Sequence, residues 1–221
     1  MTEVIDPRLQ ALTEVASQLG LTLPAGTEDR LLRYLSLLAR WNATYNLTAV
    51  RDPAEMLTQH LADCLAAIGP LRRVLAPLTA PRVLDVGSGG GLPGAVIAIV
   101  CPEWQVVCVD TVGKKAAFIR QLALELQLPN LLAEHARVEK LAPPGRFDLV
   151  TSRAFAALAD FTRLTRYHLA DGGVWMAMKG KFPAEEVASM PGDVDVFHVE
   201  QIEVPGLAAE RCLVWMRRRP A

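Results

Sequence analysis

The chain has 221 residues, of which 51% are hydrophobic and 21% charged, and its formal net charge is −1. This size fits one ordinary domain with or without a small extension, and the composition excludes a disordered or low-complexity chain. The near-zero charge also excludes a globally basic surface as a sign of nucleic-acid binding. The longest apolar run, residues 95–101, is far shorter than the roughly 20 residues of a membrane span, and the first ten residues lack a signal-peptide pattern. We therefore expect a cytoplasmic protein that does not enter a membrane.

Cysteine and histidine spacing gives no sign of a metal centre. The four cysteines are Cys64, Cys101, Cys108 and Cys212. They form no C-x-x-C pair, and the four histidines complete no zinc-ligand spacing with them. We expect buried, reduced thiols and no metal site.

The first seventy or so residues have helical periodicity and no strand signal. After Thr27 an apolar stripe recurs at helical spacing: Leu31, Leu32, Leu35, Leu38 and Trp41. A second helix start is expected at residues 52–55, where Asp can cap, Pro suits the first turn and Glu completes a capping box. We expect residues 1–72 to form a helical extension packed on a core domain of residues 73–221.

From residue 82 onwards, short apolar strands alternate with helices. Strands are expected at residues 83–86, 105–109, 131–134, 147–152 and 173–178, and helices from residue 93, at 114–128 and at 157–169. Nearly continuous apolar strands separated by helices are typical of a parallel sheet covered by helices on both faces.

The C-terminal part departs from this alternation. Residues 194–204 and 212–216 both have strand character, and the connection between them is too short for a crossover helix. The two strands are therefore expected to pair antiparallel, after an optional short helix at 183–190. The expected fold is α/β, a Rossmann-like mixed sheet that is mostly parallel, with a C-terminal antiparallel hairpin and an N-terminal helical extension.

A glycine-rich loop, GSGGGLPG (87–94), joins the first strand to the first helix of this sheet. It contains the pattern G-x-G-x-x-G, with Gly89 and Gly91 at its first two glycines, and Asp110 ends the next strand about 20 residues further on. In such sheets a carboxylate at that position reaches the ribose hydroxyls of an adenosine ligand. The alternative is that the glycines only form a tight turn and that Asp110 only caps the next helix.

Two adenosine ligands compete for this loop, a dinucleotide such as NAD and S-adenosylmethionine. A dinucleotide needs N–H donors for its pyrophosphate at the helix N-terminus, where Pro93 removes one. S-adenosylmethionine has no phosphate, and Asp85 places a carboxylate near its cationic end; alternatively, Asp85 orients the loop through backbone N–H groups. We favour S-adenosylmethionine, and an NAD-linked oxidoreductase is the alternative from another class.

The segment after the fourth strand, DLVTSRAFA (148–156), bears on the methyl acceptor. It lacks the N-P-P-Y motif of amino-methylating enzymes and the nucleophilic cysteine of cytosine-C5 enzymes, and it offers Ser152 and Arg153 instead. This pattern fits an acceptor atom that carries no proton, such as guanine N7, for which catalysis is mainly in-line positioning. The absence of these two motifs permits guanine as the acceptor but does not prove it.

Several stretches in sequence order resemble one family. They are WNATYNLT (41–48), RDPAEM (51–56), HLAD (60–63), DVGSGGGLPG (85–94), SRA (152–154), KG (179–180) and ER (210–211). On these motifs the chain resembles the small-subunit ribosomal RNA methyltransferase G family, also called glucose-inhibited division protein B.

The resemblance implies a bacterial, cytoplasmic enzyme that transfers a methyl group from S-adenosylmethionine to N7 of a guanosine in the 530 loop of 16S rRNA, leaving S-adenosylhomocysteine. The implied partner is 16S rRNA, the small ribosomal subunit or its assembly intermediate, and we expect a monomer. Two alternatives remain open, a class I methyltransferase that acts on a small molecule or protein and a non-catalytic RNA-binding relative.

The resemblance also implies the cofactor contacts Gly87, Leu92, Val138, Glu139 and Arg153. The loop and its spacing add Asp85, Gly89, Gly91 and Asp110 to these expected cofactor residues.

Three residues are expected to act on the acceptor: Arg153, Lys179 and His60. Arg153 and Lys179 end the fourth and fifth strands and therefore face the reaction cleft. We expect Arg153 to be shared between cofactor and target base and Lys179 to contact an RNA phosphate; the alternative for both is a structural ion pair. His60 and Asp63 lie three residues apart on one helix, so Asp63 can orient the imidazole, unless His60 is a packing residue.

Overall fold

The computed structural model describes residues 6–142 and 146–219. Its α-helices are α1 (Pro7–Gln18), α2 (Thr27–Tyr45), α3 (Pro53–Met56), α4 (Asp63–Leu65), α5 (Ile68–Leu75), α6 (Gly94–Val100), α7 (Gly113–Glu125), α8 (Leu158–Thr165) and α9 (Ala184–Ala188). Between α3 and α4 lies a π-helical segment, η1 (Leu57–Ala62), and there are 3-10 turns at η2 (Val138–Lys140) and η3 (Arg166–His168). None of the helices in these residues combines the length and apolarity of a membrane span.

The strands of the described residues form one mixed sheet of seven strands. Its strands are β1 (Arg82–Val86), β2 (Gln105–Asp110), β3 (Leu131–His135), β4 (Phe147–Arg153), β5 (Leu169–Lys179), β6 (Val194–Ile202) and β7 (Arg211–Arg218). Their spatial order is β3-β2-β1-β4-β5-β7-β6. The pairs from β3 to β5 are parallel, whereas β7 is antiparallel to both β5 and β6. The mostly parallel sheet with a C-terminal antiparallel hairpin is therefore confirmed.

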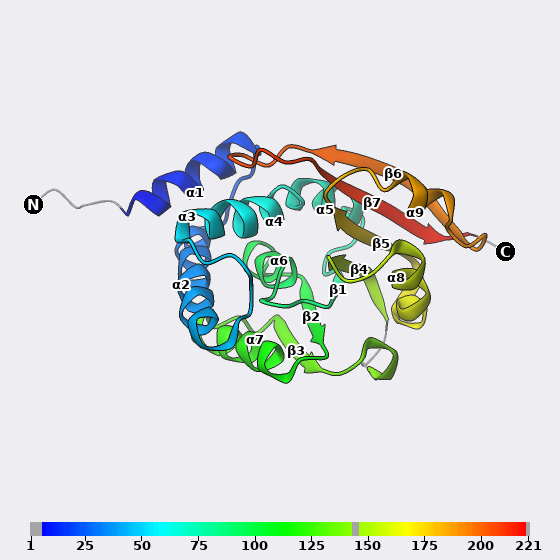
Figure 1. The fold of residues 1–221 in the computed structure, drawn as a ribbon, viewed down its shortest axis with the longest axis horizontal. Coiled ribbons are helices and arrows are strands. Elements are labelled where there is room, and N and C mark those ends of the chain that lie inside the picture. The colour runs from blue at the N-terminus through cyan, green and yellow to red at the C-terminus, as the bar shows by residue number, and fades with distance from the viewer. Residues whose placement is uncertain (1–5, 143–145, 220–221) are drawn as a thin grey trace, which may run out of the picture.

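Alternate residues of each strand face opposite hydrophobic layers, as the period of two in a β-strand requires. Val83 belongs to the layer under α6 and α7, and the next residue, Leu84, belongs to the layer under α8. Figure 1 shows α2 beside α6 and α7 on one side of the sheet and α8 on the other. Both faces of the parallel strands are buried, which explains their nearly continuous apolar sequences.

The predicted boundary between the helix and the strand on either side of residue 169 was wrong. The helix expected to run to residue 169 ends at Thr165, and the strand expected from residue 173 begins at Leu169. Leu169 pairs with Phe147, and the register then shifts before Leu149 pairs with Val174. Gly172 lies in this irregular part of β5 and has a positive φ of 78°. Glycine in such a conformation is typical of a turn or bulge, so residue propensities did not predict a strand here.

The N-terminal helices share a core with the sheet. The hydrophobic layer under α6 and α7 contains buried leucines of α2 and of η1 together with residues of β1 and β2. The expected boundary at residue 72 falls inside α5. The N-terminal helices therefore pack into the same hydrophobic core as the strands that carry the glycine loop.

Helix α2 contacts the glycine loop directly. The fully buried Tyr34 donates its hydroxyl hydrogen to the carbonyl oxygen of Gly90 over 2.9 Å. A Cβ atom at Gly90 would lie 3.0 Å from Cδ1 of Leu38. The N-terminal helix therefore supports the loop by one hydrogen bond and by close packing.

Replacing Tyr34 by Phe should remove this support. The change leaves the buried Gly90 carbonyl without its partner, so the free energy of unfolding should fall by about 1–3 kcal/mol. Denaturant unfolding would measure the loss, and Tyr167→Phe is the control because Tyr167 is 79% exposed. Equal stability of the two variants would contradict the supporting role of the hydrogen bond.

Candidate functional site

Two aspartic acids, one in β1 and one at the end of β2, hold the glycine loop. Asp110, which ends β2, accepts from the N–H of Gly89 over 3.0 Å through Oδ2 and from the N–H of Val112 over 2.8 Å through Oδ1. Asp85, in β1, is fully buried and accepts from the N–H of Gly94 over 2.8 Å through Oδ2. Asp110 therefore holds the loop as well as the turn before α7, and Asp85 orients the loop as the alternative interpretation predicted.

Gly87 makes room for a phenyl ring at the end of β1. Its φ is +68°, and a Cβ atom there would lie only 2.7 Å from Cδ2 of Phe155. Any larger residue would therefore force Phe155 away from the loop.

A cavity of about 220 Å³ lies beyond the ends of β1, β2 and β4, and we call it the loop cavity. It is lined by Val86, Gly87, Val109, Asp110, Thr111, Val112, Lys115, Ala136, Val138, Ala154 and Phe155. The structure thus brings together three of the expected cofactor residues, Gly87, Asp110 and Val138. Ligands of open α/β sheets bind at this edge, so the loop cavity is the candidate cofactor site.

The other expected cofactor residues do not line the loop cavity. Gly89 and Asp85 act through the loop hydrogen bonds, and Gly91 lets the loop pack against Ala95 of α6. Leu92 is buried in the core, whereas Glu139 is exposed beside Val138. Their direct contact with a cofactor stays a prediction.

A second cavity of about 440 Å³ lies at the ends of β4 and β5, and we call it the arginine cavity. It is lined by Gln59, His60, Arg153, Ala154, Met178, Lys179, Gly180 and Arg211. All three residues expected to act on the acceptor therefore lie in one place. Ala154 lines both cavities, so the two are adjacent at the end of β4.

Asp63 connects two arginines of this cavity. Its Oδ2 accepts from Nη1 of Arg153 over 2.9 Å, and its Oδ1 accepts from Nε of Arg211 over 2.8 Å. Asp63 is 2% exposed, so both bonds form with a desolvated carboxylate. The prediction that Asp63 orients the imidazole of His60 was wrong, because Nε2 of His60 contacts Thr48 and its Nδ1 has no hydrogen-bond partner among the described residues.

His60 is instead held by Thr48. Its Nε2 lies 2.9 Å from Oγ1 of Thr48, and its buried Nδ1 has no partner among the described residues. Burial, together with the charge of Arg153, lowers the pKa of His60 to about 4. The imidazole is therefore neutral near pH 7.

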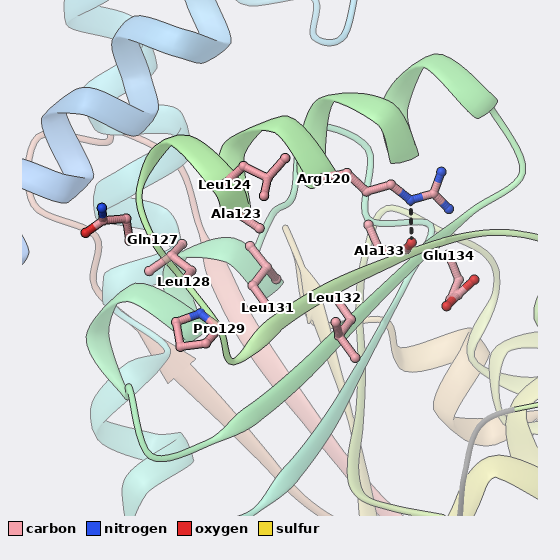
Figure 2. A pocket seen from close by; sticks show the side chains of 10 residues that line it. All are labelled: Arg120, Ala123, Leu124, Gln127, Leu128, Pro129, Leu131, Leu132, Ala133 and Glu134. Carbon is pink, nitrogen blue, oxygen red and sulfur yellow. Dashed lines mark hydrogen bonds between the residues drawn. The ribbon is translucent and has the colours of Figure 1, made fainter.

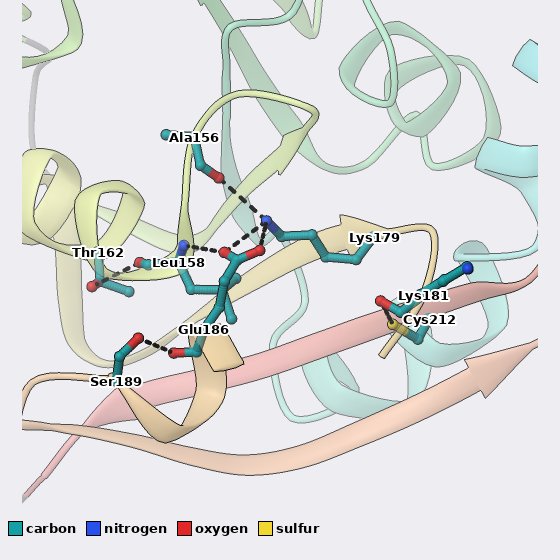
Figure 3. A network of polar contacts seen from close by, with 8 residues as sticks. All are labelled: Ala156, Leu158, Thr162, Lys179, Lys181, Glu186, Ser189 and Cys212. Atoms are coloured by element: carbon teal, nitrogen blue, oxygen red, sulfur yellow. Dashed lines mark hydrogen bonds and ion pairs between the residues drawn. The ribbon is translucent and has the colours of Figure 1, made fainter. Parts of the chain in front are cut away.

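Lys179 forms a compact ion pair. Its Nζ lies 2.9 Å from both carboxylate oxygens of Glu186 in α9 and donates to the carbonyl oxygen of Ala156 over 3.3 Å (Figure 3). The structural ion pair that was the alternative for Lys179 is thus present. Its contact with an RNA phosphate stays a prediction.

Arg211 had no predicted role, and the role predicted for Asp63 was wrong. Arg211 begins β7, and because β7 is antiparallel to β5, its first residues lie beside the end of β5, where Lys179 pairs with Cys212. The ER motif (210–211) could have indicated Arg211 as a site residue, but only with the knowledge that β7 inserts between β5 and β6. Helical spacing placed Asp63 beside His60 and could not indicate partners 90 and 148 residues away.

A cavity larger than the loop cavity or the arginine cavity lies elsewhere among the described residues. Its volume is about 830 Å³, and it lies between α7 and the edge strand β3, with Leu124 and Leu132 among its apolar walls (Figure 2). It shares no lining residue with the loop cavity or the arginine cavity and contains no part of the glycine loop. Size alone is therefore a poor guide to the site in this fold.

The cysteines and the possible metal ligands add no further chemistry. All four thiols are buried and unpaired, and burial raises the pKa of each, so they are protonated near pH 7. Within residues 6–142 and 146–219, no group of three or more His, Cys, Asp and Glu side chains could hold a metal ion.

Comparison with known proteins assigns the chain to a family. The family model GidB, described as rRNA small subunit methyltransferase G, matches residues 27–214. The chain belongs to this family. The ribosomal RNA small subunit methyltransferase G of Acidovorax sp. (strain JS42) is 60% identical over 214 residues, which cover 94% of each chain. That of Leptothrix cholodnii is 58% identical over 217 residues, which cover 97% of this chain and 98% of the relative.

Solved structures agree on the fold. The N-methyltransferase NodS from Bradyrhizobium japonicum WM9, in complex with S-adenosyl-L-homocysteine, has a TM-score of 0.57 at 15% identity and covers 85% of this chain and 98% of its own. TrmN from Thermus thermophilus has a TM-score of 0.54 at 20% identity and covers 74% and 53%. The predicted class I methyltransferase fold is confirmed. Family membership supports an S-adenosylmethionine-dependent methyltransferase of ribosomal RNA over the NAD-linked oxidoreductase.

Asp85 should make the stability of the ligand-free protein depend on pH. Burial raises the pKa of its carboxyl from 3.8 to about 7, so the folded state holds a proton that the unfolded state releases. Stability is then lost as the pH rises towards 7, by roughly 1.4 kcal/mol per pH unit. Asp85→Asn lacks this slope, so from pH 5 to pH 8 its Tm should rise relative to that of the wild type. A Tm difference that is constant with pH would contradict this account.

Asp63→Asn should impair the arginine cavity more than the fold. The variant keeps the shape but leaves two partly buried guanidinium groups without their counter-charge, which should cost about 1–3 kcal/mol of stability. Because Arg153 and Arg211 lose their alignment, kcat/KM for methyl transfer to rRNA should fall at least tenfold. The control is Asp160→Asn, which removes an exposed pair with Arg163. Activity within twofold of the control would show that Asp63 has no part in the site.

Proposed function

We propose that the protein transfers a methyl group from S-adenosylmethionine to N7 of a guanosine in the 530 loop of 16S rRNA. The observation that carries this proposal is that the two cavities are adjacent and share the lining residue Ala154. One cavity has the features of an adenosine site, and the other offers cationic side chains to an RNA nucleotide. A methyl group would pass between them at the end of β4.

The loop cavity is proposed to hold the cofactor. When bound, S-adenosylmethionine supplies an electrophilic methyl group on its sulfonium. Asp110 has the position of a ribose-binding carboxylate, although each of its oxygens already accepts one backbone N–H, from Gly89 and from Val112. An ionised carboxylate has about four lone-pair sites, so it can also accept from ribose hydroxyls. Gly87 and Val138 bound the same space.

The arginine cavity is proposed to hold the target guanosine. Arg153 gives Nη1 to Asp63 and to the carbonyl oxygen of Gln59, and its remaining N–H groups are available to an acceptor such as guanine O6. Arg211 lies beside it and can approach the RNA backbone as a second cation. Neutral His60 forms part of the wall without adding charge.

Neither Asp63 nor His60 offers a free base at the arginine cavity, which suits N7 as the acceptor atom. The Asp63 carboxylate is committed to two arginines, and the pKa of about 4 makes His60 a weak base. N7 of guanine carries a lone pair and no proton, so its methylation needs no proton removal. Catalysis would therefore consist mainly of holding the base for in-line displacement.

The proposal also covers the compartment, the oligomeric state and the RNA partner of the enzyme. We propose that the enzyme acts as a cytoplasmic monomer in bacteria and that 16S rRNA, the small ribosomal subunit or an assembly intermediate is its partner. Lys179 could contact an RNA phosphate only after release from Glu186, so for this residue we favour a role within the protein.

Borohydride reduction and aniline cleavage at 7-methylguanosine test the proposal. Purified protein, S-adenosylmethionine and unmethylated 16S rRNA should give a new cleavage site in the 530 loop. Assembled small subunits and an unrelated RNA should be assayed in parallel. Methyl incorporation without cleavage would exclude N7, and cleavage elsewhere in the RNA would exclude the 530 loop.

A further inference from the structure

We infer that Glu186 is a positioning residue, which together with Lys179 fixes the loop of residues 154–157 between the loop cavity and the arginine cavity. The inference rests on the proposed function, because it takes the two cavities as the cofactor and acceptor sites and methyl transfer to rRNA as the activity measured. It gives a role to a residue of α9, a short helix that lines neither cavity.

Glu186 bonds to two elements at once. Its two oxygens each lie 2.9 Å from Nζ of Lys179, at the end of β5, and its Oε2 also accepts from the N–H of Leu158 over 2.7 Å (Figure 3). Leu158 is the first residue of α8, and the side chain of the preceding Ala157 provides no cap. Glu186 therefore supplies from another helix the acceptor that the sequence before α8 lacks, and a carboxylate at a helix N-terminus is favoured.

Lys179 contacts both the loop and Glu186. Its Nζ donates to the carbonyl oxygen of Ala156 as well as to Glu186. The loop is thus held at Ala156 by the lysine and at Leu158 by the glutamate, and the two side chains are paired with each other. Lys179 and Glu186 are only 20% and 33% exposed, which limits screening of the pair by solvent.

The loop that is held has a conformation that needs support. Ala154 has a φ of +58°, which is unusual for a residue with a Cβ atom, and it lines both cavities. The next residue, Phe155, lies against Gly87 of the glycine loop. A shift of this loop would move Ala154, which lines both cavities, and small misplacements can lower the rate of group transfer strongly.

The competing role for Lys179 makes the opposite prediction. If Lys179 serves RNA phosphate, Glu186 competes with the RNA, and removal of its charge should strengthen RNA binding. If the pair positions the loop, removal of the charge should slow methyl transfer and leave RNA binding unchanged.

The test is steady-state kinetics of Glu186→Gln with 16S rRNA and with the matched variant Glu185→Gln. Glu185 is the exposed neighbour of Glu186 in α9, so its replacement controls for the lost charge. The amide introduced by Glu186→Gln can still accept from Leu158, but it no longer neutralises Lys179. We expect kcat to fall about tenfold for Glu186→Gln, KM for rRNA to stay within twofold, and Glu185→Gln to match the wild type.

A second variant tests whether the two residues act together. Lys179→Met should lower kcat as Glu186→Gln does, and the double variant should be no slower than either single variant. The slope of log KM against log salt should not change, whereas a lost phosphate contact lowers it by about one.

Three results would overturn the inference. They are a lower KM with unchanged kcat in Glu186→Gln, a reduced salt slope in Lys179→Met, and a loss of folded protein with normal kcat per folded molecule. If the wild type itself fails to methylate rRNA, the proposed function fails instead, so the two failures are distinguishable.

Discussion

The buried carboxylate of Asp63 joins three parts of the chain that are distant in sequence. It lies just after the π-helical segment η1 and accepts from Arg153 at the end of β4 and from Arg211 at the start of β7. A carboxylate without these two partners would be costly to bury, and two guanidinium groups without the carboxylate would repel each other. The arginine cavity therefore exists only when the N-terminal helices, the parallel strands and the C-terminal hairpin are all in place.

The antiparallel strand β7 has a corresponding effect on the sheet. By inserting between β5 and β6, it brings the beginning of a strand to the edge where the parallel strands end. Residues from both kinds of strand can then line one cavity. The hairpin thus contributes Arg211 to the site as well as covering the edge of β5.

Features that depend on residues close together in the sequence could be predicted. Strand and helix periodicity predicted the mixed sheet, and the glycine loop with Asp110 predicted the edge at which the loop cavity lies. Prediction failed where partners are distant, because nothing near Asp63 indicates two arginines and nothing near Lys179 requires Glu186. It also failed at Leu169–Gly173, where an irregular register and a positive φ at Gly172 conceal the first part of β5.

The positive charge of the arginine cavity is local, so the overall composition of the chain could not predict it. The chain as a whole has a net charge of −1, yet three cations, Arg153, Lys179 and Arg211, line the arginine cavity. Asp63 and Glu186 compensate two of these charges, and neutral His60 adds none, so an excess of one positive charge remains at the cavity. The compensating carboxylates orient the cations while keeping the local field modest. Attraction of RNA to such a cavity depends on where the cations are held more than on how many the chain contains.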